Sequence, residues 1–206
     1  MQEFPFMNQN PRTRTRIVAL GGTLRPQSSG SAALSLCLNI ARKEGCEVRL
    51  ITGVELNLPM YDPAMPTLPP AARAMLDALR DADGLVVASP GYHGSMSGLV
   101  KNALDYIEGL RHDARCYLDD VPVGCIVSAA GSQAGDSTLA ALRSVIHSLR
   151  GWPTPLGVTF NSISSPFDQN GNCSDEALVA KLTQLTTQVI LMARLLGSRR
   201  SGNTGQ

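Results

Sequence analysis

The segment ADGLVVASPGYHGSMSGLVKNALDYIEGL, residues Ala82 to Leu110, carries the strongest structural signal in the chain. It begins with the apolar run Leu85–Ala88, continues through the turn-rich stretch Ser89–Ser97, and leaves through Gly98 into apolar residues at helical spacing. Strand, loop and helix in this order predict one unit of a parallel α/β sheet. The loop falls at the carboxyl end of its strand, where such sheets bind ligands.

The residues of this loop suit contact with a flat ring. Tyr92 is flanked by Pro90, Gly91 and Gly94, so its side chain can lie against a ring while exposed backbone groups reach the polar edge of that ring. A surface loop that caps a strand and binds nothing explains the same residues. The loop alone favours neither interpretation, and a second loop provides the deciding signal.

That second loop follows the apolar run Arg16–Leu20 and leads, from Gly21 to Ser31, into a helix expected to begin near Ala32. Hydroxyls and a guanidinium can donate to oxygen atoms, and the helix N-terminus adds free N–H groups and the positive end of its dipole. Neither the P-loop pattern nor Gly-x-Gly-x-x-Gly is present. An ordinary serine-rich helix N-cap explains one serine but not the whole set of donors. We therefore favour a site for a phosphate monoester; the donors are Thr23, Arg25, Ser28, Ser29 and Ser31.

Together the two loops resemble a known family. Gly-Thr-x-Arg-x-x-Ser at Gly22–Ser28, Ser-Pro-Gly-Tyr-His-Gly-Ser at Ser89–Ser95 and the helix Gly98–Gly109 resemble the NAD(P)H-dependent FMN reductases of the flavodoxin-like superfamily. The resemblance extends over roughly Thr15–Leu196. It implies that the first loop holds the FMN phosphate and that the second packs on the isoalloxazine. It also implies a glycine-rich loop beside the flavin at Ala130–Gly135.

The resemblance and the residues together give a set of expected cofactor contacts. We expect FMN as cofactor and NADPH or NADH as hydride donor, with no catalytic side chain, because hydride transfer to the flavin needs no protein nucleophile. The chain departs from the usual family pattern at His93, where Asn is common, and at Ser132, where a second Gly is common. The expected phosphate contacts are Thr23, Arg25, Ser28 and Ser31; the expected ring contacts are Pro90, Gly91, Tyr92, His93, Gly94 and Ser95, with Gly131 and Ser132 across the crevice.

Five strands that alternate with five helices predict a three-layer α/β/α sandwich with a five-stranded parallel sheet of order 2-1-3-4-5 (flavodoxin-like). This order places the loops after the first and third strands side by side. We expect a single flavodoxin-like domain over residues 1–206, with flexible tails at 1–14 and 198–206. The expected strands are Arg16–Leu20, Glu47–Ile51, Leu85–Ala88, Val121–Ala129 and Leu156–Phe160, and the expected helices are Ala32–Glu44, Ala71–Asp81, Leu99–Leu110, Thr138–Leu149 and Asp175–Leu196.

Composition narrows the class of protein. A chain of 206 residues with 43% hydrophobic residues can bury a core unaided. A net charge of +1 gives no strong positive electrostatic potential, so we do not expect nucleic acid as a partner. The apolar stretches are too short to cross a bilayer, so we expect a cytoplasmic protein without a membrane partner. Five scattered cysteines and three histidines lack ligand spacing, so we expect neither disulfides nor a metal site.

The most favoured function is an NAD(P)H-dependent FMN reductase. Its reduced FMN either stays bound or passes to a flavin-dependent monooxygenase. A second interpretation is an FMN-containing reductase of a quinone, azo dye, nitro compound or metal oxyanion, which requires the same residues. A flavodoxin-type electron carrier is a more distant alternative, because such carriers tend to be acidic. The helix Leu99–Leu110 carries more apolar surface than one side of a sheet requires, and the resemblance implies that it packs against a partner subunit. We therefore expect a homodimer or homotetramer in which Tyr106 or neighbouring residues approach the other protomer's site, although a helix buried only in its own domain explains the pattern too.

Overall fold

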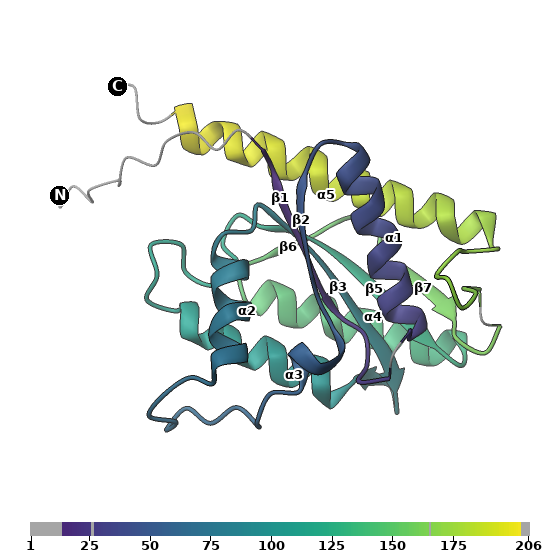
Figure 1. Ribbon diagram of the computed structural model, residues 1–206, viewed down its shortest axis with the longest axis horizontal. Coiled ribbons are helices and arrows are strands. Elements are labelled where there is room, and N and C mark those ends of the chain that lie inside the picture. Colours follow the sequence, from purple (N-terminus) through teal and green to yellow (C-terminus); the bar gives the residue numbers. More distant parts are fainter. Residues whose placement is uncertain (1–13, 26, 165, 203–206) are drawn as a thin grey trace.

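A mainly parallel sheet forms the middle layer of the molecule, and helices cover both of its faces (Figure 1). The computed structural model describes residues 14–25, 27–164 and 166–202. The strands are β1 Arg16–Gly21, β2 Glu47–Ile51, β3 Gly84–Tyr92, β4 Ser95–Met96, β5 Pro122–Ala129, β6 Trp152–Pro153 and β7 Val158–Asn161. The helices are α1 Ser29–Lys43, α2 Pro70–Arg80, α3 Gly98–Asp105, α4 Ser132–Ser148 and α5 Glu176–Gly202, with 3₁₀ turns η1 Gly53–Leu56 and η2 Tyr106–Leu110.

The strand order confirms the three-layer fold class and corrects its detail. Within the described residues the sheet has seven strands in the order β2-β1-β3-β5-β6, while β4 pairs antiparallel with β3 and β7 pairs with β5. The expected fifth strand Leu156–Phe160 is found as β7, and the short strand β6 precedes it outside the expected range; both pair with β5. Pro155 lies between them and has no N–H to donate to a ladder, so the pairing with β5 is interrupted there.

Two apolar layers hold the helices against the sheet. Helices α1 and α5 cover one face, and α2, α3 and α4 cover the other (Figure 1). Tyr106 belongs to the second layer: it is fully buried in its own domain, its hydroxyl donates to the Pro59 carbonyl at 3.1 Å, and its ring meets Tyr61 edge-on. Tyr106 itself is therefore not available to a partner's site, and the expected approach of the segment Leu99–Leu110 to another protomer stays a prediction for its neighbouring residues. No helix of the described chain is long and apolar enough to span a membrane.

Two helices begin several residues earlier than expected. Helix α1 begins three residues before Ala32, and α4 begins six residues before Thr138, because small polar residues fill both first turns and hide the apolar periodicity there. The expected end of the first helix at Glu44 agrees with the structure to within one residue, and Gly45, which follows it, ends the helix. The Gly45 N–H donates to the Arg42 carbonyl and the Cys46 N–H donates to the Ala41 carbonyl, both at 3.0 Å. These two hydrogen bonds form a Schellman motif at the end of α1.

Two further boundaries lie in the second half of the chain. The expected helix Leu99–Leu110 is α-helical only to Asp105 and continues as the 3₁₀ turn η2. Helix α5 continues to Gly202, so the first part of the expected tail 198–206 is helical. Residues 1–13 and 203–206, which make up the rest of the expected tails, lie outside the described residues.

Candidate functional site

The loop after β1 is fastened to β3 at the point where both strands end. The Gly22 N–H donates to the Ala88 carbonyl at 3.0 Å. Gly21 has a φ of 136°, and a Cβ at this position would overlap the carbonyl oxygen of Ala88 and lie 2.8 Å from its carbon. Because the two backbones approach so closely, the residue before the loop has to be glycine. The first expected loop therefore lies directly beside β3.

Three hydroxyl groups surround the bare Cα of Gly22. A Cβ there would overlap Ser31 Oγ and lie 2.9 Å from Thr52 Oγ1 and 3.3 Å from Ser28 Oγ. Ser28 is the N-cap of α1 and accepts from the Ser31 N–H at 3.2 Å. The Ser31 hydroxyl is 2.8 Å from the Ser28 hydroxyl and 2.8 Å from the Thr52 hydroxyl. Thr52 is absent from the set expected from the sequence, because only the sheet order brings the end of β2 beside this loop.

The remaining phosphate candidates lie on the outer part of the same loop. The Thr23 hydroxyl accepts from the Arg25 N–H at 3.1 Å, which closes a tight turn, and the Arg25 side chain is exposed. The first N–H groups of α1 follow directly and have no intrahelical acceptor. A helix N-terminus, clustered hydroxyls and one cation fit a phosphate monoester, so these residues match the phosphate end of FMN.

The second expected loop is a β-hairpin. Strand β3 continues to Tyr92 and pairs with β4 through Gly91–Met96 and Tyr92–Ser95. The two residues between the strands, His93 and Gly94, have φ values of 51° and 85°, as a type I′ turn requires. Asn-Gly is favoured in such turns, so His93 replaces the family's Asn at a position with a backbone role. The Tyr92 side chain beside it is 55% exposed.

A buried serine holds the base of this hairpin. The Ser89 hydroxyl accepts from the Ser97 N–H at 3.0 Å and donates to the Pro90 carbonyl at 2.9 Å. The Ser97 hydroxyl in turn caps α3 by accepting from the Val100 N–H at 3.2 Å. Ser89 is fully buried and does not belong to the set of site residues expected from the sequence. The sequence indicates such a role only through the position of Ser89, a single polar residue at the end of an apolar run.

The hairpin packs on the first turns of α4. A Cβ at Gly91 would lie 3.0 Å from Thr138 Oγ1, 3.1 Å from Ala129 Cβ and 3.2 Å from the Ala134 carbonyl oxygen. The expected glycine-rich loop over Ala130–Gly135 is mostly helix, because α4 begins at Ser132. Gly131, its N-cap, and Ser132 are exposed at the end of β5, the strand next to β3. The three groups of expected site residues thus follow three neighbouring strands.

Two buried thiols, Cys37 and Cys125, do not suit nucleophilic chemistry. Burial raises the pKa of Cys37 to about 11 and that of Cys125 to about 12, so both thiols remain protonated near neutral pH. Within the part of the chain that the structure describes, no cluster of His, Cys, Asp and Glu has the arrangement of a metal site. The arrangement at the carboxyl end of the sheet can bind and orient a ligand that brings its own chemistry.

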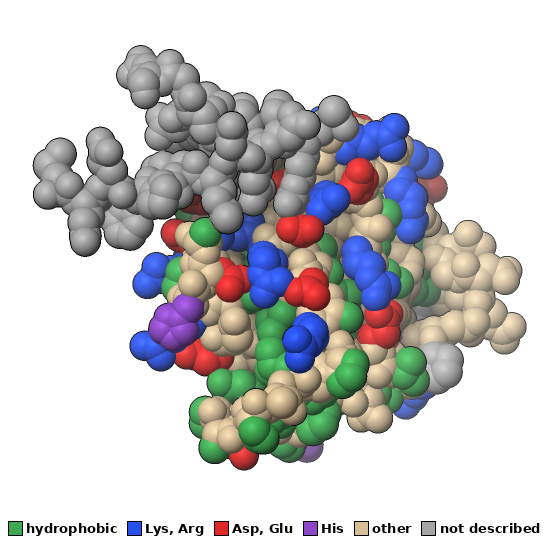
Figure 2. Space-filling view, turned by 60° about the vertical axis from the view of Figure 1, so that its left-hand side comes forward, with side chains coloured by type: hydrophobic (Ala, Val, Ile, Leu, Met, Phe, Trp, Pro, Cys, Tyr) green, Lys and Arg blue, Asp and Glu red, His purple; other side chains and the backbone are tan. Residues whose placement is uncertain are grey.

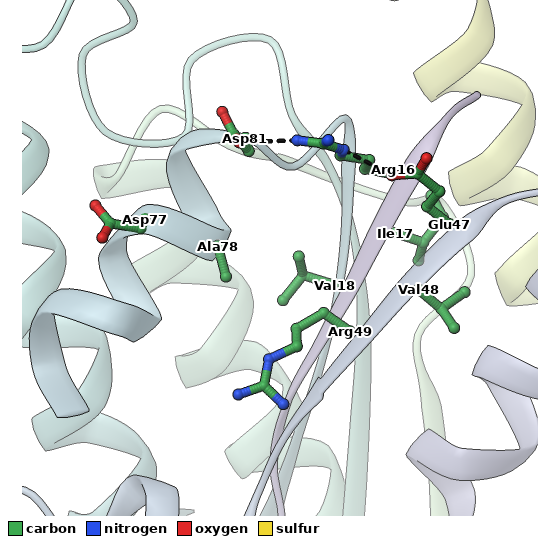
Figure 3. Close-up of a pocket in the computed structure, with 9 residues that line it drawn as sticks. All are labelled: Arg16, Ile17, Val18, Glu47, Val48, Arg49, Asp77, Ala78 and Asp81. Atoms are coloured by element: carbon green, nitrogen blue, oxygen red, sulfur yellow. Dashed lines mark hydrogen bonds and ion pairs between the residues drawn. The ribbon is translucent and has the colours of Figure 1, made fainter. Parts of the chain in front are cut away.

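A separate hollow of about 330 Å³ lies at the opposite end of β1 and β2, against the last turn of α2 (Figure 3). Arg16 crosses its rim and forms ion pairs of 2.8 Å with both Glu47 and Asp81. Basic and acidic side chains are intermixed over the described part of the face seen in Figure 2. Since its charged rim is already paired and it is remote from the loops, this hollow is not the candidate site.

Comparisons with known proteins agree with the geometry. A family described as NADPH-dependent FMN reductase matches residues 15–164. A protein of Oryza sativa subsp. japonica named probable NADPH:quinone oxidoreductase 2 is 30% identical over 183 residues, which are 82% of this chain and 84% of the relative. An FMN-dependent NADPH-azoreductase of Staphylococcus saprophyticus is 39% identical over 79 residues, 37% of each chain.

The solved structures extend the likeness to the fold. FerB from Paracoccus denitrificans, a flavoenzyme NAD(P)H:(acceptor) oxidoreductase, superposes with a TM-score of 0.71 at 18% identity, over 87% of this chain and 97% of FerB. At that identity the likeness concerns the fold alone. The match to the family covers both loops and the helices that follow them. The chain therefore belongs to the NADPH-dependent FMN reductase family and is an FMN-dependent oxidoreductase of flavodoxin-like fold.

Proposed function

We propose that the loops after β1 and β3 of a single flavodoxin-like domain bind one FMN, with its phosphate at the N-terminus of α1 and its isoalloxazine against the hairpin. The observation that supports this most directly is the hydrogen bond between Gly22 and Ala88, which holds the two loops beside each other on adjacent strands. A single ligand with a phosphate at one end and a flat ring at the other suits that juxtaposition.

Each group of residues has a distinct task in this proposal. The hydroxyls of Thr23 and Ser28 donate to phosphate oxygens, the Ser31 hydroxyl supports Ser28 through their mutual hydrogen bond, and the exposed guanidinium of Arg25 adds a positive charge. The backbone from Pro90 to Ser95 reaches the polar edge of the ring, and Tyr92 packs on its face. Gly131 and Ser132 border the ring from the side of β5. All of these groups bind or orient the flavin.

FMN bound in this way would supply the redox chemistry, namely hydride transfer from a reduced nicotinamide and electron transfer to an acceptor. The protein restricts the orientation of the ring through the hairpin, whose base is fixed by Ser89. Tyr92 is exposed and so leaves the outer side of the site open to the nicotinamide and to the acceptor. NADPH or NADH is the donor in this proposal.

Free FMN is the acceptor we favour, and a quinone is the second candidate. The quinone is supported by the rice relative, which aligns with 82% of this chain, and by apolar side chains on three segments near the site. Leu24, Val54 and Met60 are 48%, 83% and 79% exposed, and they follow β1 or β2. Such side chains suit an apolar acceptor, or a second copy of the chain.

The same apolar side chains support a homodimer or a homotetramer, now without Tyr106 in the interface. Light scattering after size exclusion measures the mass directly. A monomer at micromolar concentration would remove this part of the proposal. Transfer of reduced FMN to a monooxygenase and a cytoplasmic location stay predictions.

The central experiment is a flavin titration followed by a steady-state assay. FMN binding is followed by flavin fluorescence, and oxidation of NADPH and of NADH is then followed with FMN alone and with a quinone added. Saturable oxidation with FMN alone supports the flavin reductase. Turnover that needs the quinone transfers the assignment to the second candidate, and absence of FMN binding refutes the proposed site.

Arg25→Ala tests the phosphate end of the site, and Arg150→Ala, an exposed arginine beside β6 at the other end of the sheet, is its matched control. Loss of a hydrogen bond to a charged group is worth about 1.5–3 kcal/mol, so we expect at least about tenfold weaker FMN binding for Arg25→Ala only. Equal effects of the two substitutions would indicate long-range charge and not a contact.

A further inference from the structure

We infer that Thr52 is a positioning residue: it sets the direction of the hydrogen-bond chain through Ser31 and Ser28, and it thereby makes the site prefer FMN over riboflavin. This inference rests on the proposed FMN site. Thr52 follows β2 and lies outside both family motifs, so its role comes from its contacts in the folded chain.

The hydroxyl of Thr52 forms its hydrogen bond with Ser31 and not with the 3₁₀ turn η1 that it precedes. Thr52 is the N-cap of η1, a position where a threonine side chain normally accepts from the following turn, yet it makes no such bond. Its Oγ1 instead lies 2.8 Å from Ser31 Oγ. The parallel pairing of β2 with β1 brings the two residues together, although 21 positions separate them.

Counting protons shows what this contact does. Ser28 Oγ already accepts from the Ser31 N–H, and each of the three hydroxyls carries one proton. If Thr52 donates to Ser31 and Ser31 donates to Ser28, the proton of Ser28 stays free to point out of the chain. In the opposite direction Ser28 donates to Ser31 and presents only lone pairs outward. A phosphate dianion and the positive end of the α1 dipole favour the first direction.

Thr52 is the donor at the start of this chain. Without its hydroxyl, Ser31 Oγ loses the group that donates to it and that fixes its rotamer, and the polarisation transmitted to Ser28 falls. The loss acts only on a ligand that carries a phosphate. Riboflavin has the same ring but no phosphate, so its binding should not depend on Thr52.

The test compares FMN and riboflavin affinities by fluorescence titration of the full-length apoprotein. The variants are Thr52→Val, which keeps the shape and removes the hydroxyl, and Thr52→Ser, which restores a hydroxyl. Thr183→Val is the control, because the Thr183 hydroxyl donates to a carbonyl of its own helix on the exposed side of α5. Thermal melting of each apoprotein establishes that the variants fold.

We expect Thr52→Val to weaken FMN binding about two- to tenfold, the effect of one hydrogen bond between neutral hydroxyls, and to leave riboflavin binding and melting close to the control. Thr52→Ser should recover most of the FMN affinity. An unchanged FMN affinity in Thr52→Val, or an equal loss for both flavins, would overturn the role of Thr52. A wild-type protein that binds FMN no better than riboflavin would instead refute the proposed phosphate site.

Discussion

Replacing Gly21 with alanine tests whether the phosphate loop is locked against β3. The φ of Gly21 is 136°, and a new Cβ would overlap the Ala88 carbonyl and lie 2.9 Å from the Ala88 nitrogen. Ala88 cannot move away easily, because β3 lies between β1 and β5 and pairs with both. Backbone strain of this kind costs about 1–3 kcal/mol, and forced overpacking costs about 1–3 kcal/mol more. We therefore expect the free energy of unfolding to fall by about 2–6 kcal/mol.

Gly45→Ala is the matched control for this substitution. Gly45 also has a positive φ, 79°, but a Cβ there would meet nothing within 4 Å, so only the conformational cost of about 1–2 kcal/mol applies. Urea unfolding followed by circular dichroism gives both values in the same assay. If Gly21→Ala costs no more than Gly45→Ala, the contact with Ala88 relaxes freely, and the argument that this junction positions the loop fails.

Three substitutions test the hairpin. Ser89→Ala leaves the buried Ser97 N–H without its acceptor, so urea unfolding should show a loss of about 1–3 kcal/mol; an unchanged midpoint would mean that another group replaces Ser89. Thr138→Val removes a fully buried hydroxyl that has no hydrogen-bond partner among the described residues, so the melting temperature should stay equal or rise, and a fall would reveal a hidden bond. His93→Asn places a better residue at the positive φ of the type I′ turn, so the unfolding midpoint should rise slightly while FMN affinity persists; a loss of affinity would show that the imidazole contacts the flavin.

Much of the fold is readable from the sequence because each long strand is an apolar run bounded by turn residues. The run Leu85–Ala88 lies within β3, and the first helix ends within one residue of the expected Glu44. Strand β4 was missed because two residues carry no periodicity, and the hairpin is recognised only through the positive φ of His93 and Gly94. With the family's usual Asn in place of His93, the sequence would read Asn-Gly, which predicts a type I′ hairpin more strongly.

The site is only partly readable, since its members come from segments far apart in the chain. Local motifs identify the loop after β1 and the tip of the hairpin. Thr52 and Ser89 are single polar residues at strand ends, and their roles depend on which strands are neighbours. The early start of α4 was hidden because Ser132–Ser137 contains no large apolar residue, although a helix N-terminus is itself a useful binding element.

The two ends of the proposed flavin site are held differently, and this difference bears on specificity. The phosphate end is fixed by backbone: Gly21 packs on Ala88, and Gly22 is enclosed by hydroxyls that bond to one another. The ring end is fixed at its base by Ser89, while Tyr92 at its tip is exposed. A rigid phosphate site and an open ring site together select the flavin strictly and the acceptor loosely. On this argument the preference for the cofactor follows from the loop after β1, whereas the exposed tip of the hairpin at Tyr92 leaves the choice of acceptor open.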